Sequence, residues 1–385
     1  MIPYGKQEIT QCDIKAVLDV LQSPFITQGP QVKAFESAIA NKVNAKYASA
    51  FNSATSALHC AVLALGLRKN DYLWTSPISF VASSNCALYC KAKVDFVDIN
   101  PKTYNIDVDL LEAKLRNSKK NKLPKVLVAV HFGGQSCDME RIFALSREFD
   151  FKIIEDASHA LGGKYKGFRI GSCKFSDISI FSFHPVKIIT SAEGGIATTN
   201  SEKYHHKMEL LKSHGITKNK KDFYKKSNAP WYYEEQILGY NYRLSELHAA
   251  LGLSQLERLE QYVAKRNALA KKYNEALKNL ALITPFIEDF NFSAFHLYPI
   301  VLKKNCGIKR KALFKEFLKA DIYPQVHYIP IHLQPFYQRF GFKKGDFKNA
   351  ELYYKRAISL PLFPSMREDE QDKVIEILRK FIKNG

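Results

Sequence analysis

The sequence predicts an α/β protein, with a mostly parallel sheet between helices and a smaller C-terminal α+β domain. Short apolar segments alternate with segments of helical periodicity from residue 47 to about residue 183, which is typical of parallel strands joined by helices. After about residue 280 this alternation changes. A chain of 385 residues is also long for a single core. We therefore expect a large domain over 1–265 and a small domain over 266–385.

Strands are expected where short, mainly apolar runs are bounded by turn-forming residues. In the large domain these runs cover 47–51, 72–75, 94–98, 125–131 and 152–155, followed by a strand that ends near 183 and a return strand over 196–199. In the small domain the run over 296–302 predicts a further strand.

Helices are expected where apolar residues recur at helical spacing. The predicted helices cover 12–22, 30–43, 52–65, 80–91, 107–117, 139–149 and 201–213, then one long helix over 245–278, then 308–320 and 372–383. Between them, the polar, aromatic and lysine-rich segment 217–238 is expected to be a loop.

The chain carries a net charge of +19, which could reflect nucleic acid or anionic lipid as a partner. Much of the excess lies in two lysine clusters, at 119–122 and 218–226, which are expected to be solvated loops. No zinc-finger spacing, RNP-like aromatic strand or basic heptad accompanies these clusters. Binding to nucleic acid is therefore not expected.

The sequence predicts neither a membrane span nor a metal site. No apolar run approaches the roughly 18 residues that indicate a span, and residues 1–8 lack the apolar core of a signal peptide. The seven cysteines are scattered, and no second Cys/His pair with ligand spacing accompanies Cys86 and Cys90. We expect a cytoplasmic protein with reduced thiols.

A run of small and hydroxyl-bearing residues, Asn52-Ser53-Ala54-Thr55-Ser56, joins the strand over 47–51 to the next helix. The N-terminus of a helix offers backbone N–H groups and the positive end of the helix dipole, which suit a phosphate. Ordinary N-capping by Ser53 or Thr55 would explain the same residues. This junction alone leaves both interpretations open.

The most informative stretch is Phe181-Ser182-Phe183-His184-Pro185-Val186-Lys187, followed by Glu193-Gly194-Gly195. Asp156 ends an apolar strand 31 positions before Lys187, where a carboxylate needs a cation as its partner. Pyridoxal phosphate (PLP) requires a lysine that forms a Schiff base and an acid that pairs with the protonated pyridine nitrogen. Lys187 could instead be a surface lysine in a turn, but its spacing from Asp156 and the Glu-Gly-Gly turn favour a PLP site.

Four side chains, those of Thr55, Phe80, His131 and Asp156, follow predicted strands. Ligands of such sheets bind at the carboxyl ends of the strands, so we expect these residues to converge on one site. Phe80 is a candidate for covering the cofactor ring. Thr55 and Ser182 are candidates for holding its phosphate.

Further motifs follow one another along nearly the whole chain. In order they are Thr27-Gln28-Gly29-Pro30, 52–58, 77–82, 131–135, 155–160, 182–187, 193–195, 241–244, 249–252, Gln255-Leu256, 296–298 and 327–330. With these motifs the chain resembles the DegT/DnrJ/EryC1/StrS group of sugar aminotransferases. That resemblance implies the fold-type-I architecture of PLP-dependent transferases.

The resemblance implies roles around the cofactor ring. Lys187 would be the Schiff-base lysine, and Asp156 would be the partner of the pyridine nitrogen. His159 would lie near the ring oxygen, and Phe80 would stack on the ring.

The resemblance also implies how the phosphate is held. Ser182 would bind it together with the backbone at Ala54 and Thr55. Asn241 would reach the phosphate of the neighbouring subunit's cofactor, so the active unit would be a homodimer. Most of the family has glycine where this chain has Ala54, which removes freedom of the backbone at that point.

The implied reaction is an amino transfer in two halves. L-glutamate would give its amino group to the cofactor, which would pass it to a ketone of a nucleotide-linked hexose while Lys187 moves the proton. His327 and Tyr328 would lie toward the sugar nucleotide. In the related sugar dehydratases a histidine replaces this lysine, so Lys187 favours transamination. A PLP-binding regulator without turnover is the alternative from another functional class.

The substrate is implied by finer features of the sequence. Ala54, the run 191–195 and the run 325–328 resemble the pseudaminic-acid branch of the family. That branch aminates C4 of a UDP-linked 4-keto-6-deoxy-N-acetylhexosamine and forms UDP-4-amino-4,6-dideoxy-N-acetyl-β-L-altrosamine. A bacillosamine-type or perosamine-type 4-aminotransferase is the alternative.

Overall fold

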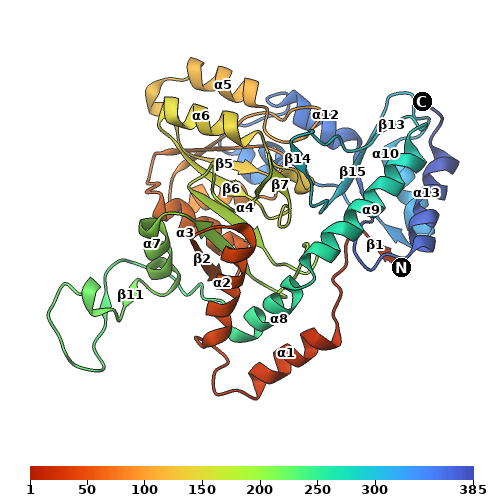
Figure 1. Ribbon diagram of the computed structural model, residues 1–385. Helices are drawn as coiled ribbons and strands as arrows, with labels where there is room; N and C mark the ends of the chain where they lie inside the picture. Colours follow the sequence, from red (N-terminus) through yellow and green to blue (C-terminus); the bar gives the residue numbers. More distant parts are fainter.

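The core of the protein is a seven-stranded sheet (Figure 1). The computed structural model describes residues 1–385. In spatial order the strands are β2 (Tyr47–Phe51), β10 (Gly195–Thr199), β9 (Ile178–Ser182), β6 (Lys152–Asp156), β5 (Pro124–Val130), β3 (Tyr72–Thr75) and β4 (Lys93–Phe96). Only β10 runs antiparallel to its neighbours. The mostly parallel sheet and the return strand predicted from the sequence are confirmed.

Helices cover both faces of this sheet. Ile154 packs in a buried cluster with α3 (Ala54–Ala64), α4 (Ala82–Tyr89) and α7 (Glu202–Lys212). Its neighbour Ile153 packs on the opposite face, because successive side chains of a strand alternate. That face is covered by α5 (Val108–Asn117) and α6 (Met139–Phe149), and nearer β2 by α2 (Pro30–Val43) and α8 (Glu246–Leu256). The predicted three-layer arrangement is therefore confirmed.

A second buried cluster lies in the C-terminal part of the chain. It contains α9 (Leu259–Leu277), α10 (Arg310–Lys319), α13 (Glu368–Phe381) and an antiparallel sheet of β13 (Leu282–Ile283), β15 (Tyr298–Leu302) and β17 (Ala357–Leu360). The N-terminus joins this cluster, because β1 (Ile2–Pro3) pairs with β16 (Ile322–Tyr323) and Ile2 is buried. This part is the smaller α+β unit that was expected, and the division at residue 265 stays a prediction.

Shorter elements complete the fold. They are α1 (Gln11–Leu21), which packs on α8, the small sheet of β7 (Lys164–Tyr165), β8 (Phe168–Arg169) and β14 (Asn291–Phe292), and the helices α11 (Pro335–Gln338) and α12 (Lys348–Arg356). No helix of the protein combines the length and the apolar character needed to cross a membrane.

The prediction of one long helix over 245–278 is wrong, because α8 ends at Leu256 and α9 begins at Leu259 (Figure 1). The apolar periodicity continues across this break, and the sequence has no glycine or proline there to mark it. Arg258 at the break donates from Nη2 to both carboxylate oxygens of buried Asp13 (2.7 and 2.6 Å). A contact with a distant segment thus fixes the break, and local periodicity cannot reveal it.

The Thr27-Gln28-Gly29-Pro30 motif gains a structural explanation. Glu246, which is fully buried, accepts the N–H groups of Gln31 (2.7 Å) and Val32 (3.1 Å) at the start of α2. A carboxylate stabilises a helix at this end. A Cβ atom on Gly29 would lie 2.7 Å from Glu246 Oε2. Glycine before the proline therefore leaves room for the carboxylate that caps α2.

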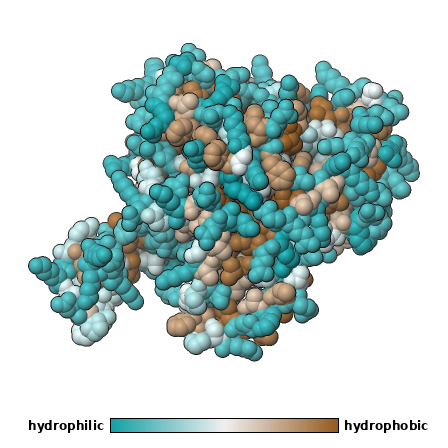
Figure 2. All heavy atoms as spheres, in the orientation of Figure 1, coloured by the Kyte–Doolittle hydropathy of each residue, from teal (hydrophilic) through white to brown (hydrophobic).

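The lysine-rich segment forms an arm that extends away from the body of the molecule (Figure 1). It contains the short pair β11 (Ile216–Thr217) and β12 (Glu234–Glu235). Figure 2 shows the arm mainly in hydrophilic and intermediate colours. Tyr224 (81%), Trp231 (79%) and Leu238 (79%) are nevertheless largely exposed on it. The arm thus presents large apolar side chains together with lysines to the solvent.

Candidate active site

A cavity of about 360 Å³ lies at the carboxyl ends of the parallel strands. Polar groups from the ends of β2, β3, β6 and β9 meet there with a segment from the C-terminal part of the chain. Nine of the ten predicted site residues line this cavity: Ala54, Thr55, Phe80, Asp156, His159, Ser182, Lys187, His327 and Tyr328. Asn241 does not.

Lys187 lies on the loop after β9 and faces the cavity. Burial lowers the pKa of its amine to about 8, although the carboxylate of Asp156 opposes this shift. An amine with that pKa is neutral in roughly a tenth of the molecules at pH 7, far more often than an ordinary lysine. Lys187 is therefore available as a nucleophile and as a proton carrier.

Asp156 is the last residue of β6, and its side chain is only 6% exposed. Its Oδ2 accepts a hydrogen bond from Ser83 Oγ (2.6 Å), and its Oδ1 accepts one from the Ser158 N–H (3.2 Å). It forms no ion pair within the chain at salt-bridge distance. A buried carboxylate in this position is matched to a cationic group of a ligand.

The N-terminus of α3 forms another wall of the cavity. Ser53 is its N-cap and accepts the N–H of Ser56 at 3.1 Å. The N–H groups of Ala54 and Thr55, which precede the first intrahelical bond, have no acceptor in the chain. N-capping by Ser53 and a phosphate site are therefore compatible at this junction, because the cap leaves the N–H groups of Ala54 and Thr55 for an anion.

The glycine at the start of β10 is needed beside this helix end. A Cβ atom on Gly195 would lie 2.4 Å from the backbone nitrogen of Ala54. Ala54 itself begins α3 without a positive φ, so its methyl group causes no strain. The hydroxyl groups of Thr55 and Ser182 also line the cavity, and neither has a hydrogen-bond partner in the chain.

His159 and Tyr328 form a hydrogen-bonded pair on the cavity wall. His159 Nδ1 accepts the Gly133 N–H (3.3 Å), and its Nε2 lies 3.0 Å from the Tyr328 hydroxyl. Burial, with the charge of Lys187, holds the pKa of His159 well below its usual value. The ring is therefore neutral with its proton on Nε2, which donates to Tyr328. The Tyr328 proton then remains free for a group in the cavity.

His327 and Phe80 also line the cavity. His327 Nδ1 lies 2.9 Å from Ser359 Oγ, and burial lowers the pKa of His327 to about 3. Phe80 is 59% exposed, and its ring centroid lies 6.5 Å from that of Tyr328. An exposed aromatic ring at the rim suits the expected stacking on a planar cofactor.

Asn241 is exposed and lies outside the cavity of its own chain. Its backbone bridges to Ser213, and the rings of Tyr240 and Tyr242 beside it stack at 4.9 Å. The contact of Asn241 with the phosphate of a neighbouring subunit's cofactor, which the resemblance implies, stays a prediction.

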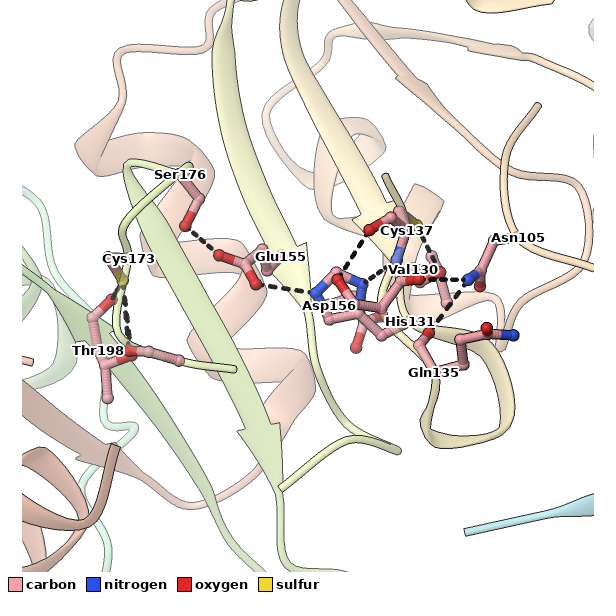
Figure 3. A network of polar contacts seen from close by, with 12 residues as sticks. Asn105, Val130, His131, Gln135, Cys137, Glu155, Asp156, Cys173, Ser176 and Thr198 are labelled. Atoms are coloured by element: carbon pink, nitrogen blue, oxygen red, sulfur yellow. Dashed lines mark hydrogen bonds and ion pairs between the residues drawn. The ribbon is translucent and has the colours of Figure 1, made fainter. Parts of the chain in front are cut away.

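The expected convergence of His131 with the other strand-end residues is wrong. His131 accepts the Cys137 N–H at Nδ1 (3.2 Å), so its proton is on Nε2, which donates to Glu155 Oε2 (2.8 Å) (Figure 3). Glu155 also accepts a hydrogen bond from Ser176. Glu155 and Asp156 are adjacent in a strand and point to opposite faces, and His131 lies on the face of Glu155.

Several residues in and behind the cavity wall were not predicted from the sequence. Tyr4 lines it from the N-terminal segment, with its ring centroid 5.0 Å from that of His327. Ser83, which binds Asp156, lies behind the wall on α4. Ser79 and Ser83 are four positions apart, with Ser79 in the turn before α4, and this spacing was the only local signal. Nothing in the sequence near Tyr4 indicates its position.

The polar groups of the cavity fit PLP. Two free N–H groups at a helix N-terminus and the two hydroxyls of Thr55 and Ser182 form a site for a phosphate. The amine of Lys187 and the unpaired carboxylate of Asp156 match the aldehyde and the pyridine nitrogen. One chain therefore provides partners for the phosphate, the aldehyde and the pyridine nitrogen of the cofactor.

Two named relatives match the whole chain. The spore coat polysaccharide biosynthesis protein SpsC of Bacillus subtilis is 40% identical, over 100% of this chain and 98% of the relative. A UDP-4-amino-4,6-dideoxy-N-acetyl-beta-L-altrosamine transaminase of Campylobacter jejuni is 39% identical, over 100% of this chain and 99% of the relative. Both identities are high enough to indicate a shared fold.

Solved structures agree with these relatives. Helicobacter pylori PseC, an aminotransferase involved in the biosynthesis of pseudoaminic acid, has a TM-score of 0.89 at 33% identity and covers 99% of this chain and 98% of its own. A putative sugar aminotransferase of Streptococcus pneumoniae in its PLP form has a TM-score of 0.90 at 28% identity, over 99% and 100%. Residues 7–379 match the DegT/DnrJ/EryC1/StrS aminotransferase family. The chain therefore belongs to this family and is a PLP-dependent nucleotide-sugar aminotransferase.

Proposed function

We propose that the protein transfers the amino group of L-glutamate to C4 of a UDP-linked 4-keto-6-deoxy-N-acetylhexosamine, as in pseudaminic acid biosynthesis. The product would be UDP-4-amino-4,6-dideoxy-N-acetyl-β-L-altrosamine. The observation that carries the proposal is the shared cavity of Lys187, whose pKa burial lowers to about 8, and the buried Asp156. The printed names of the Campylobacter jejuni and Helicobacter pylori proteins support the choice of sugar.

Lys187 and Asp156 divide the work around the cofactor. When bound, PLP supplies an electron-accepting ring that acidifies the carbon next to the transferred nitrogen. Lys187 Nζ takes up and returns the proton at that carbon, which its lowered pKa allows at neutral pH. Asp156 supplies the negative charge that keeps the pyridine nitrogen protonated.

The remaining cavity residues bind and orient. Thr55 and Ser182, with the N–H groups at the start of α3, hold the phosphate and so fix the position of the ring. Phe80 would cover the ring of bound PLP, and His159, which is paired with Tyr328, would lie near its oxygen. His327 and Tyr328 face the sugar nucleotide.

We also propose that the active unit is a homodimer in which Asn241 completes the site of the partner. Asn241 is exposed and lies outside its own cavity, and the nearby arm presents Trp231 and Leu238. Apolar side chains of this size on an extended arm suit an interface between subunits.

Subunit complementation tests this role of Asn241. Lys187→Ala and Asn241→Ala each damage every site of their own homodimers. A mixed dimer, however, combines the intact Lys187 of one chain with the intact Asn241 of the other. Mixing the two inactive proteins after mild dissociation should restore up to about a quarter of the native activity. A mixture that contains hybrid dimers but stays inactive would contradict the proposal.

The substrate is tested by an amination assay with UDP-, GDP- and dTDP-linked 4-keto sugars and glutamate as donor. We expect the UDP-linked 4-keto-6-deoxy-N-acetylhexosamine to be preferred about tenfold or more in kcat/KM. NMR of the product gives the configuration at C4. The second candidate is a bacillosamine-type or perosamine-type 4-aminotransferase, which the 40% identity with SpsC, a protein of another polysaccharide, keeps open. A preference for a GDP-linked sugar, or a product of different configuration, would favour it.

A further inference from the structure

Two buried serines form a chain of hydrogen bonds that ends on Asp156. Ser79 Oγ lies 2.6 Å from Ser83 Oγ, and Ser83 Oγ lies 2.6 Å from Asp156 Oδ2. Ser79 is 3% exposed, Ser83 is fully buried and Asp156 is 6% exposed. Ser83 comes from α4, whereas Asp156 ends β6, so two separate elements meet at this contact.

The carboxylate of Asp156 decides which hydroxyl donates in each of these two hydrogen bonds. An ionised carboxylate can only accept, so the hydroxyl of Ser83 donates to Asp156. Ser83 has a single proton, and the hydroxyl of Ser79 must therefore donate to Ser83. The Ser83 hydroxyl thus accepts one bond and donates the next, which strengthens both bonds in a buried environment.

The hydrogen bond from Ser83 is the only short one that the Asp156 carboxylate accepts. The Ser158 N–H reaches Oδ1 at 3.2 Å, which is longer than the 2.6 Å bond from Ser83 to Oδ2. Hydrogen bonds to charged groups are stronger than neutral ones and set the direction of the group that accepts them. The orientation of Asp156 in the cavity therefore depends chiefly on Ser83.

We infer that Ser83, supported by Ser79, is a positioning residue that aims the Asp156 carboxylate at the pyridine nitrogen of PLP. This inference rests on the role proposed for Asp156. Neither serine has to touch the reacting atoms, because their effect passes through the carboxylate. Without Ser83, Oδ2 loses its donor, and the carboxylate turns or binds a water molecule instead of holding the ring nitrogen.

The same helix offers a matched control. Ser84 is also fully buried on α4, and its hydroxyl contacts the Tyr337 hydroxyl at 2.6 Å. Neither Ser84 nor Tyr337 lines the cavity. Ser84→Ala therefore removes a buried hydroxyl of the same kind from the same helix without touching Asp156.

The test compares the binding of PLP by Ser83→Ala, Ser79→Ala, Ser84→Ala and Asp156→Asn. Each protein is freed of cofactor and titrated with PLP that carries ¹⁵N in its ring. Ser83→Ala should weaken PLP binding about tenfold and shift the ring ¹⁵N resonance toward the deprotonated form. Ser79→Ala should act in the same direction but less strongly, and Ser84→Ala should leave both readings unchanged.

Thermal unfolding of the cofactor-free proteins separates positioning from folding. Ser83→Ala removes the contacts with Ser79 and Asp156, and Ser84→Ala removes the contacts with Val81 and Tyr337. Since each variant loses two buried hydrogen-bond contacts, the two should lose similar stability. Ser83→Cys, which is close in size and a weaker donor, should fold and should lie between Ser83→Ala and the native protein in PLP affinity.

Two results would overturn the inference. One is native PLP affinity and a native ¹⁵N shift in Ser83→Ala while Asp156→Asn is impaired, since the carboxylate would then work without its donor. The other is equal impairment of Ser84→Ala, which would indicate a general effect of α4. If Asp156→Asn itself bound PLP normally, the role of Asp156 would fail first, independently of which sugar is the substrate.

Discussion

Two neighbouring acids at the end of β6 have opposite surroundings. Glu155 is satisfied by its own chain, because His131 donates to it at 2.8 Å and Ser176 donates to its other oxygen. Asp156 points to the other face of the sheet, accepts from Ser83, and opens on the cavity that contains Lys187. Both side chains are nearly inaccessible, at 5% and 6% exposure.

The difference shows how a buried acid becomes functional. A buried carboxylate such as Glu155, whose two oxygens both accept hydrogen bonds within the chain, stabilises the fold and is not free to bind a ligand. A carboxylate with one strong donor and an open cavity in front of it is incomplete until a cation binds. Glu155 and Asp156 are adjacent in β6 but lie on opposite faces of the sheet, because successive side chains of a strand alternate.

The largest expected effect is on activity and comes from Asp156→Asn. The amide keeps the size of the side chain but removes the charge that holds the pyridine nitrogen protonated. We expect kcat/KM for amino transfer to fall about a hundredfold or more, with little change in unfolding. Steady-state kinetics with saturating PLP measure this. Near-native turnover would show that the cavity acid is as dispensable for chemistry as Glu155.

Lys187→Met should make the cofactor-free protein more stable. Lys187 has a pKa of about 8 in the fold and an ordinary value of 10.5, so the folded state binds fewer protons than the unfolded state between these values. The free energy of unfolding of the native protein therefore rises with pH across this window. The gain from Lys187→Met should be about 3 kcal/mol below pH 8 and should vanish toward pH 10.5. Urea unfolding at several pH values checks this, and a constant difference would contradict it.

Glu155→Gln should lower the stability of the protein and leave its activity nearly unchanged, the opposite of what is expected for Asp156→Asn. It removes the charge between His131 and Ser176 but leaves the cavity intact. The free energy of unfolding should fall by about 1–3 kcal/mol, while PLP affinity and kcat stay within about twofold. Urea unfolding and PLP titration measure the two effects. A large loss of activity without a loss of stability would mean that the two faces of the sheet are coupled.

The comparison also indicates what the sequence can and cannot predict. The sheet, Asp156, Lys187 and the helix end at Thr55 were predictable, because strand ends and helix starts have local signals. His131 was misplaced, since the face to which a residue turns after a strand depends on its tertiary partners, here Glu155 and the Cys137 N–H.

Contacts between distant segments were beyond the reach of local patterns. The bond from Ser83 to Asp156 joins positions 73 residues apart, and the break after α8 depends on a contact of Arg258 with Asp13, 245 residues away. No periodicity or turn signal encodes either contact. Such residues can be found only once the packing of the elements is known.

The smallest expected effect concerns Tyr4, which lines the cavity beside His327. Tyr4 lies against His327, with 5.0 Å between the ring centroids, and its hydroxyl has no partner in the chain. Its backbone oxygen accepts the Leu362 N–H at 3.0 Å, so the N-terminal segment is held in place. A fixed phenol with a free hydroxyl is suited to bind a polar group of the sugar nucleotide.

Tyr4→Phe removes this hydroxyl and keeps the ring. We expect KM for the keto-sugar to rise about fivefold, whereas the half-reaction with glutamate, followed by the cofactor's absorbance, should keep its rate. Tyr323→Phe is the control, because Tyr323 lies on β16 beside the same N-terminal segment but outside the cavity. Equal slowing of both half-reactions would instead mean that the Tyr4 hydroxyl acts on the cofactor and does not bind the sugar nucleotide.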